Sequence, residues 1–395
     1  MGACMAIPLI YSFRSIAVRK GSSAMAIAGI ALVVIVFIAL LALADGFRKA
    51  VETSGRPDNL IILRKGADAE LQSQVTREAG RIISELPLVA QDERGKRLFT
   101  AESVIILSRP KRSGGDTNIV VRGTTPESVL VHSEVRLKEG RWFSQGSDEA
   151  VIGSGLARRL EGFSLNQLIT SGKHQWKITG IFEANGSALE SEIWMDSELL
   201  QTAFNRGNIF QSFLFRAVGS QALALQQLDA ILENDPRLRS LEARREDEYY
   251  KKQSQLMTQI ITTLGGMLTA IMAIGAVTGA MNTMYAAASQ RQREIGCLLA
   301  MGFSPGAVWL AFIVESLMLS SVGAVLGCAA SFYFQGMKTG TVNWQTFSET
   351  AFEFHITLDI ALSATLLALS MGFIGGVFPA FRAARMKVVD ALRRT

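Results

Sequence analysis

The chain has 395 residues, of which 49% are hydrophobic and 19% are charged, and its formal net charge is +5. The mean hydropathy is +0.25. Soluble domains usually carry about 25% charged residues, so this composition favours a membrane protein over a soluble one. The basic residues lie mostly at the edges of apolar blocks, which is typical of membrane orientation rather than of nucleic-acid binding. We therefore expect no nucleic-acid partner.

The apolar residues form four blocks. The first, residues 24–44, has no charge and matches the roughly 20 residues that a helix needs to cross a bilayer core of about 30 Å. The second is uncharged from Gln253 to Gln290, longer than one crossing requires, and the mixed charges of Leu241–Lys252 are consistent with an extension of this helix as a stalk. We predict transmembrane helices at residues 23–45, 255–287, 305–335 and 358–382.

Basic residues indicate how these helices are oriented. They precede the first helix, occupy the loop at 288–304 and follow the fourth helix, whereas the loop at 336–357 sets Lys338 against Glu349 and Glu353. The positive-inside rule then places both termini, the loop at 288–304 and the tail at 383–395 in the cytoplasm, and residues 46–254 outside. The segments placed in the cytoplasm are too short to form an enzyme, so none is expected there. The basic residues concerned are Arg14, Arg19, Lys20, Arg291, Arg293, Arg382, Arg385, Lys387, Arg393 and Arg394.

Residues 46–254 are expected to form a mixed α/β domain. Short runs of β-branched and aromatic residues, bounded by glycine, proline or charges, predict strands, and apolar residues at helical spacing predict helices. The strands are expected at 59–63, 103–107, 118–122, 176–182 and 213–215, and the helices at 69–86 and 220–234. We predict a discontinuous arrangement, with a subdomain A at about 50–110 plus 207–250 and an inserted subdomain B at about 111–206.

The sequence of this domain shows no catalytic or metal-binding pattern. His132 and His174 have no cysteine or carboxylate at metal-ligand spacing, which predicts surface or packing roles for both. Gly153-Ser154-Gly155 lacks the G-x-S-x-G spacing of a nucleophile elbow. The three cysteines of the chain lie outside the domain, so it is expected to fold without disulfides. These patterns favour a binding or mechanical module over an enzyme.

The loop at 288–304 contains a short amphipathic helix. Ile295, Leu298 and Leu299 share one face, while Arg291, Arg293 and Glu294 mark a polar end. Gly302 is a candidate stop, and Ser304-Pro305 supplies an N-cap followed by proline at the first helical position of the next helix. One interpretation is an anchor whose apolar face enters the membrane interface. That interpretation explains the arginines but not why both ends of the helix are so well defined.

The segment Q-R-Q-R-E-I-G-C-L-L-A-M-G-F-S-P (residues 290–305) resembles the signature loop of ABC transporter permeases of the FtsX/MacB kind, "R-x-x-E-I-G-x-x-x-A-x-G". Three further passages are similar to this family: the N-terminal I-Y-S-F-R-S-I-A-V-R-K, the passage Leu137–Phe143 followed by Val151-Ile152-Gly153, and the tail Pro379–Arg393. Val389 stands near the usual proline of the tail. The first of these passages looks like the family's amphipathic N-terminal helix, expected at residues 1–22.

The resemblance implies an α-helical membrane protein with four transmembrane helices, a large α/β extracytoplasmic domain between the first two, and a location in the bacterial inner membrane. It implies a dimer of identical or paralogous protomers and two copies of a separate ATPase subunit, which would bind ATP and Mg²⁺. The ATPase would grip the loop at 288–304, the coupling helix of the family, through Arg291, Arg293, Glu294, Ile295 and Leu298. The sequence has no G-x-x-x-x-G-K-[ST], so this chain is expected to bind no cofactor and to hydrolyse no ATP.

Two functions follow from the resemblance. The first is export or extraction of an amphipathic or hydrophobic cargo (a drug, peptide, lipid or lipoprotein), which a membrane-fusion adaptor and an outer-membrane channel would accompany in a tripartite exporter. The alternative is FtsX-like signalling, in which the outside domain regulates a cell-wall hydrolase and nothing is transported. A third reading, an enzyme or sensor kinase, has no catalytic pattern to support it.

Small and charged residues inside the predicted spans complete the candidate sites. Three G-x-x-x-G pairs permit close helix approach and are candidates for helix packing or the dimer interface, although glycine is common in such helices. Glu315 lies about two turns into the third span, where a transport role, snorkelling and local pairing are all open. The pairs are Gly275 with Gly279, Gly323 with Gly327, and Gly372 with Gly376.

Overall fold

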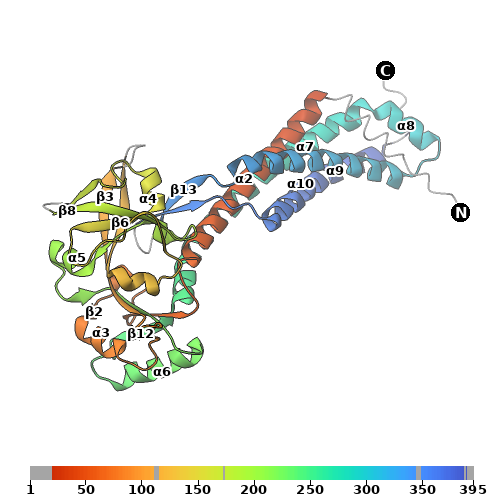
Figure 1. Ribbon diagram of the computed structural model, residues 1–395. Helices are drawn as coiled ribbons and strands as arrows, with labels where there is room; N and C mark the ends of the chain where they lie inside the picture. The colour runs from red at the N-terminus through yellow and green to blue at the C-terminus, as the bar shows by residue number, and fades with distance from the viewer. Residues whose placement is uncertain (1–19, 111–114, 172–173, 344–347, 387, 389–395) are drawn as a thin grey trace. The chain divides into compact units, whose positions relative to one another are not determined.

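The structure is a computed structural model that describes residues 20–110, 115–171, 174–343, 348–386 and 388. The predicted helix at 1–22, except its last residues, and most of the tail at 383–395 lie outside the described residues. The chain divides into two compact units (Figure 1). Of the described residues, the helical unit contains those up to Ala44, those from Ile260 to Met337 and those from Phe354 on. The α/β unit contains Asp45–Gln259 and Lys338–Glu353.

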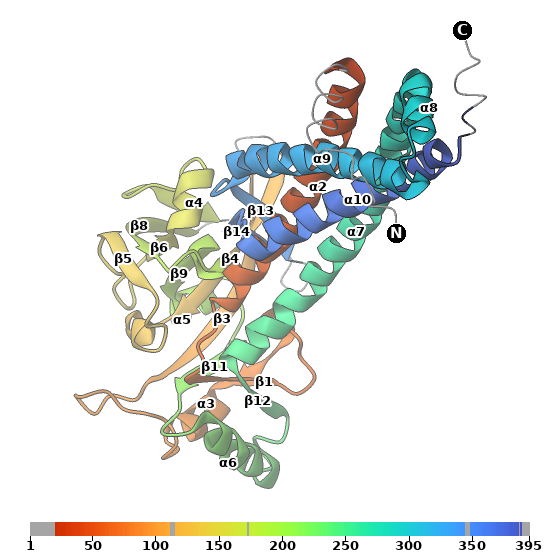
Figure 2. The same ribbon diagram turned by 90° about the vertical axis from the view of Figure 1, so that its right-hand side faces the viewer.

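Four helices are long and apolar enough to cross a membrane, among the residues that the structure describes. This confirms the predicted class, four apolar helices with a mixed α/β domain between the first and the second. In the helical unit α9 and α10 pack along each other (Figure 2). The helices are α2 (Lys20–Glu52), α7 (Glu246–Gln290), α9 (Pro305–Ser331, followed by the 3₁₀ turn η4, Phe332–Phe334) and α10 (Leu358–Ala384), and the short α8 (Gln292–Ala300) joins α7 to α9.

The second apolar helix differs from its prediction at its N-terminal end. Leu241–Arg245 is not part of the stalk, because it forms the edge strand β12, antiparallel to β1 (Asn59–Arg64). The helix begins at Glu246 with three acidic residues in its first turn, where they favourably face the positive end of the helix dipole. It then continues without a break to Gln290.

The α/β unit is built on one long mixed sheet with the order β12-β1-β11-β3-β4-β9-β6-β8-β5, and β7 pairs with β8. The five predicted strands are confirmed, and most extend beyond their predicted ends. Parallel pairing occurs between β4 and β9 and between β6 and β8. The remaining bounds are β3 (Phe99–Pro110), β4 (Asp116–Thr124), β5 (Arg136–Gly140), β6 (Glu149–Gly153), β7 (Leu168–Ser171), β8 (His174–Glu183), β9 (Glu192–Asp196) and β11 (Ser212–Arg216).

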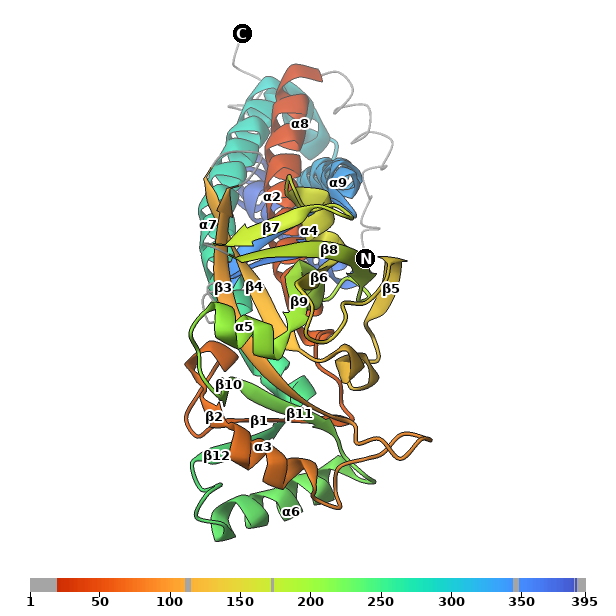
Figure 3. The ribbon, with the colours of Figure 1, turned by 60° about the vertical axis from the view of Figure 1, so that its left-hand side comes forward.

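Three hydrophobic clusters of described residues pack on this sheet, and two of them join it to helices. One joins β1, β11 and β12 to α3 (Arg77–Ser84) and α6 (Gln221–Asn234), and the other joins β4, β6 and β8 to α4 (Ser154–Arg159) and α5 (Ser197–Ala203). Figure 3 shows α3 and α6 beside β12, β1 and β11, and α5 beside β3 and β4. The first cluster draws on residues 60–101 and 210–243 and the second on residues 105–204. The boundaries of subdomains A and B themselves stay a prediction.

The helix predicted at 69–86 is wrong over its first half. The chain there forms a 3₁₀ turn, η1 (Glu70–Gln72), and a short strand, β2 (Val75–Thr76), which pairs with β10 (Ile209–Phe210). The helix α3 starts only after Thr76, whose hydroxyl accepts a hydrogen bond from the N–H of Ala79. An N-cap threonine is a strong start signal, and it overrides the apolar spacing upstream.

The loop predicted at 336–357 is a β-hairpin. Strand β13 (Lys338–Asn343) pairs antiparallel with β14 (Ser348–Glu353), from Lys338 opposite Glu353 to Asn343 opposite Ser348. Although it connects α9 to α10, the hairpin belongs to the α/β unit. It therefore packs with residues that precede it by more than 140 positions, such as Ser191.

Candidate functional site

Local hydrogen bonds close the C-terminal end of the short helix α8 and start the helix that follows it. After its C-cap Met301, Gly302 adopts φ +94°, its N–H donates to the carbonyl of Leu299 (3.2 Å), and Phe303 N–H donates to the carbonyl of Leu298 (3.1 Å). This pair of bonds is the Schellman motif, which needs the left-handed conformation that glycine adopts without strain. The next helix then starts at Ser304, whose hydroxyl accepts from Ala307 N–H (3.2 Å). The predicted stop and restart are both confirmed.

The faces of α8 differ in exposure. Arg293, Glu294 and Cys297 are exposed, Leu298 is half-buried, and Ile295 is buried in the core of the helical unit. Ile295 packs in a cluster with residues of α7, α9 and α10, such as Met284, Phe312 and Ala380. The exposed side chains are therefore available to another protein, while Ile295 fixes the helix to the transmembrane bundle.

Arg291, which precedes α8, forms an ion pair inside the helical unit. Its guanidinium lies 2.9 Å from the carboxylate of Glu315 and 3.1 Å from that of Glu294, and it sits over the ring of Phe312 at 5.6 Å. Arg291 and Glu315 are both buried. A charge in this setting is costly unless it is paired, so each member holds the other in place. Of the three roles considered for Glu315 from the sequence, the structure shows the local pairing, with Arg291.

The three glycine pairs have different surroundings. A side-chain carbon added at Gly323 or Gly327 would meet Ile30 and Val34 of α2 at 2.9 and 2.6 Å. One added at Gly376 would meet Ser316 of α9 at 2.7 Å, and one added at Gly372 would come still closer to Ser320 of α9. These four glycines thus pack helices within one chain. A side-chain carbon added at Gly275 or Gly279 of α7 would meet no atom of the described residues within 4 Å, and both glycines line a groove of about 340 Å³ between α2 and α7.

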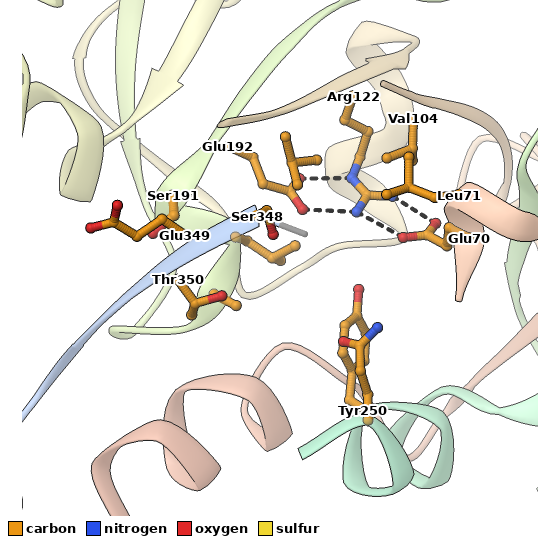
Figure 4. Close-up of a pocket in the computed structure, with 14 residues that line it drawn as sticks. Glu70, Leu71, Val104, Arg122, Ser191, Glu192, Tyr250, Ser348, Glu349 and Thr350 are labelled. Atoms are coloured by element: carbon orange, nitrogen blue, oxygen red, sulfur yellow. Dashed lines mark hydrogen bonds and ion pairs between the residues drawn. The ribbon is translucent and has the colours of Figure 1, made fainter. Parts of the chain in front are cut away.

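A second charged site, in the α/β unit, surrounds Arg122 of β4. Its guanidinium binds the carboxylates of Glu192 (2.7 Å), Glu70 (2.9 Å) and Glu102 (2.5 Å), and all four side chains are buried. Figure 4 shows the bonds from Arg122 to Glu192 and Glu70. The carboxylates accept further hydrogen bonds, from the indole N–H of Trp194 to Glu192 (2.8 Å) and from the Ser212 hydroxyl to Glu70 (2.6 Å). The sequence analysis missed this cluster because its members lie far apart along the chain and share no motif.

The cluster continues through His132. Its Nε2 lies 2.8 Å from Glu102 and its Nδ1 lies 3.6 Å from Glu134. Burial alone would lower the pKa of His132, but the charge of Glu102 raises this pKa well above its usual range. His132 is therefore a buried, charged packing residue, whereas His174 is exposed and stacks on Trp176. Within the described parts of the chain, no group of three or more histidine, cysteine or acidic residues is arranged to hold a metal ion.

Glu246, the first residue of α7, is a further buried acid near this cluster. Its carboxylate accepts hydrogen bonds from the N–H of Arg56 (3.0 Å) and from the amide of Asn59 (2.9 Å). Burial, with a smaller contribution from Glu134, raises the pKa of Glu246 to about 7. Glu246 thus joins the start of α7 to the chain that follows α2.

The Arg122 cluster borders a small chamber of about 40 Å³. In Figure 4 the hydroxyl of Tyr250, from α7, points into it, and Ser348, Glu349 and Thr350 of the hairpin line another side. The volume suits water rather than an organic ligand. The chamber is the place in the α/β unit where α7, the hairpin and the buried charges meet.

The hairpin is fastened to the sheet by specific contacts. Glu349 lies 3.1 Å from the guanidinium of Arg159 and accepts a hydrogen bond from the hydroxyl of Thr117 (2.7 Å). The N–H of Ala351 donates to the hydroxyl of Ser191 (2.9 Å). Phe352 packs edge-on against Phe47 with 5.9 Å between ring centres. Polar and apolar contacts together make the hairpin part of the α/β unit.

Comparison with known proteins gives two family matches in chain order. The model described as the MacB-like periplasmic core domain matches residues 23–231, and the one described as the FtsX-like permease C-terminal region matches residues 266–388. The macrolide export ATP-binding/permease protein MacB of Bdellovibrio bacteriovorus is 24% identical over 413 residues, covering 96% of this chain. The uncharacterized ABC transporter permease YknZ of Bacillus subtilis is 21% identical over 295 residues, covering 70% of each chain.

This chain spans about 60% of the length of MacB relatives such as the Bdellovibrio protein. A solved structure, the periplasmic region of MacB from Actinobacillus actinomycetemcomitans, is 11% identical and covers 53% of this chain and 94% of its own, with a TM-score of 0.39.

Proposed function

Because this chain belongs to the family of MacB- and FtsX-like ABC transporter permeases, we propose that it couples ATP hydrolysis by a separate ATPase subunit to movement of its α/β unit. The observation that carries this proposal is α8, which links α7 directly to α9 and exposes one face. In this proposal Arg293, Glu294 and Leu298 contact the ATPase, which holds ATP and Mg²⁺. Arg291 and Ile295, which are buried, hold α8 to the bundle.

The path of the movement follows from covalent connections. A displacement of α8 pulls on α7, and the N-terminal end of α7 lies in the α/β unit. It also pulls on α9, and the chain that follows α9 forms the hairpin. A helix of 45 residues, about 68 Å long at 1.5 Å per residue, transmits an axial displacement with little loss. In this proposal the termini and α8 lie in the cytoplasm of a bacterium, the α/β unit lies outside the inner membrane, and the cargo is amphipathic or hydrophobic.

We further propose a dimer of permease chains with two ATPase subunits. The apolar stretch of α7 is 11% buried, against 39–50% for the other three candidate spans. Because its own chain covers so little of this helix, α7 has surface available to pack against a helix of a second protomer. A membrane-fusion adaptor and an outer-membrane channel would extend the complex to tripartite export.

Matched neutral substitutions test the proposal. Arg293→Gln combined with Glu294→Gln is expected to lower the ATPase activity of the co-purified complex about tenfold, since it removes the charged contacts of the exposed α8 face. Arg385→Gln, at the end of α10, is the control and is expected to leave activity unchanged. Normal assembly and turnover in the α8 variant would contradict the coupling role. If the α/β unit captures a cell-wall hydrolase and no export is detected, the signalling alternative replaces transport.

A further inference from the structure

The α/β unit contains a second cavity, of about 240 Å³, which the proposed coupling does not use. Its walls come from α4, from the turn at residues 186–190 and from the hairpin. The lining combines three cationic and two anionic side chains with an apolar wall. It consists of Gly155, Arg158, Arg159, Gly186, Ser187, Glu190, Lys338, Ala351, Phe352 and Glu353.

The charged side chains of this cavity differ in how many hydrogen bonds and ion pairs they make with other residues. Glu190 is a well-bound carboxylate, because it accepts hydrogen bonds from the N–H groups of Ala184 (2.9 Å) and Gly186 (2.8 Å) and from the Ser154 hydroxyl (2.8 Å). Arg159 is held by Glu349. Arg158 reaches Glu190 only at 3.4 Å and its side chain is 43% exposed. It therefore keeps N–H donors for a ligand.

Lys338 makes an exchangeable ion pair. Its ammonium lies 3.0 Å from Glu353, and both side chains are about half exposed. Exposed pairs of this kind contribute little to stability, so an anion in the cavity competes with Glu353 at low cost.

Ser187 gives independent evidence for a ligand. It is 1% exposed, it lines the cavity, and its hydroxyl has no hydrogen-bond partner among the described residues. A buried hydroxyl without a partner is unusual in a native protein and indicates a missing water or ligand atom. The neighbouring wall of Ala351 and Phe352 is apolar, so the ligand combines an acceptor group with apolar surface.

We infer that this cavity binds the phosphate group of an anionic phospholipid headgroup. Guanidinium and ammonium groups bind phosphate well, and the Ser187 hydroxyl supplies a neutral donor. The volume admits a headgroup rather than a whole lipid. Short linkers join the hairpin that carries Lys338 and Phe352 to two candidate membrane spans, the one that ends at Phe334 and α10, which starts at Leu358. Phospholipid headgroups are the phosphate groups most abundant at a bilayer surface.

Binding to the purified full chain in detergent, without ATPase, tests this inference independently of the coupling proposal. The probe is dihexanoyl phosphatidylglycerol, a water-soluble short-chain lipid, titrated by calorimetry. We expect Arg158→Gln to weaken binding at least tenfold and Ser187→Ala to weaken it several-fold. The matched control is Arg136→Gln on β5, an exposed arginine outside the cavity, which is expected to bind as the unchanged protein does.

Two further measurements make each outcome decisive. Without lipid, the Ser187→Ala variant is expected to have a melting temperature equal to or above that of the unchanged protein, because the substitution removes an unpartnered buried hydroxyl. Added lipid is expected to raise the melting temperature of this variant less than that of the unchanged protein. Equal binding by the Arg158, Ser187 and Arg136 variants would overturn the site. If inorganic phosphate binds as tightly as the short-chain lipid and displaces it, the ligand is free phosphate and the lipid assignment is wrong.

Discussion

Arg291 and Glu315 are buried together in the helical unit, and their charges belong to different structural elements. Glu315→Gln leaves the Arg291 guanidinium without its carboxylate, and loss of one partner of a buried pair typically costs about 3–5 kcal/mol. We therefore expect Glu315→Gln to lower the melting temperature of the purified permease clearly. Replacing both residues by methionine is expected to cost less than the sum of the two single changes.

The control for this pair is Glu294→Gln, because Glu294 also contacts Arg291 but is exposed. Exposed pairs contribute about 0–1 kcal/mol, so this variant is expected to melt within a degree or two of the unchanged protein. Equal effects of the Glu294 and Glu315 changes, or strict additivity in the double variant, would show that the buried pair does not hold α8.

Glu246 gives the α/β unit a pH dependence with a defined sign. Its pKa is about 7 in the folded chain against a usual value of 4.5, so the folded state binds the proton more tightly. The stability this proton contributes is complete below pH 4.5 and is lost as the pH rises to about 7, by on the order of 3 kcal/mol. Glu246→Gln is expected to flatten the dependence of melting temperature on pH in this window.

Two other buried groups near Glu246, His132 and Glu102, also make the stability of the α/β unit depend on pH. His132, whose pKa is raised, also loses stabilisation as the pH rises, but above its usual value of 6.5. Glu102 contributes in the opposite direction: burial alone would raise its pKa, but His132 and Arg122 lower it to about 2, so its stabilisation is lost on acidification below 4.5. A slope between pH 4.5 and 6.5 that survives Glu246→Gln would contradict the assignment.

At the scale of elements, the side chain of Glu349 makes two of the contacts that fasten the hairpin β13–β14. Glu349→Ala removes both the Arg159 ion pair and the Thr117 hydrogen bond, so amide hydrogens of β14 are expected to exchange faster. Glu353→Ala is the matched control, since Glu353 pairs with the exposed Lys338. Unchanged exchange in the Glu349 variant would mean that apolar packing alone, including Phe352 on Phe47, fastens the hairpin.

Elements with strong local signals could be predicted from the sequence. The uncharged blocks are long enough to identify four helices, and Gly302 with Ser304-Pro305 defines where α8 stops and α9 starts, because capping depends on residues within a few positions. The buried strand Asn59–Leu63 is equally clear from its run of apolar residues. Such features need no knowledge of distant contacts.

Elements that depend on distant partners could not be predicted. The charged Leu241–Arg245 becomes a strand only because β1 offers an edge, and the hairpin at 338–353 is stabilised by β4, α4 and η3 (Ala188–Ser191). In the Arg122 cluster, Glu102, Glu70 and Glu192 lie 20, 52 and 70 positions from Arg122 and on separate elements. The surroundings of the glycine pairs differ for the same reason, since a G-x-x-x-G pattern does not say which neighbour it faces.

At the scale of the whole molecule, substitutions in the groove between α2 and α7 test the proposed dimer. Gly275→Leu or Gly279→Leu fills the groove, and each is expected to reduce the dimer fraction in detergent by at least half if α7 packs against a second copy there. Gly266→Leu is a matched control, since Gly266 is also open but lies nine residues away, on the opposite side of an α-helix. An unchanged dimer in all three variants would place the interface elsewhere.

Contact between α8 and the ATPase is tested most directly through the native thiol of Cys297, which is exposed on α8. With the other two cysteines replaced by serine, a benzophenone maleimide attached at Cys297 is expected to cross-link the ATPase subunit in the assembled complex. The yield should change when ATP is added. The same reagent on a cysteine at Leu362, near the other end of the bundle in α10, should give no such product. An ATPase that co-purifies but never cross-links from Cys297 would contradict the claim that force enters the permease through α8.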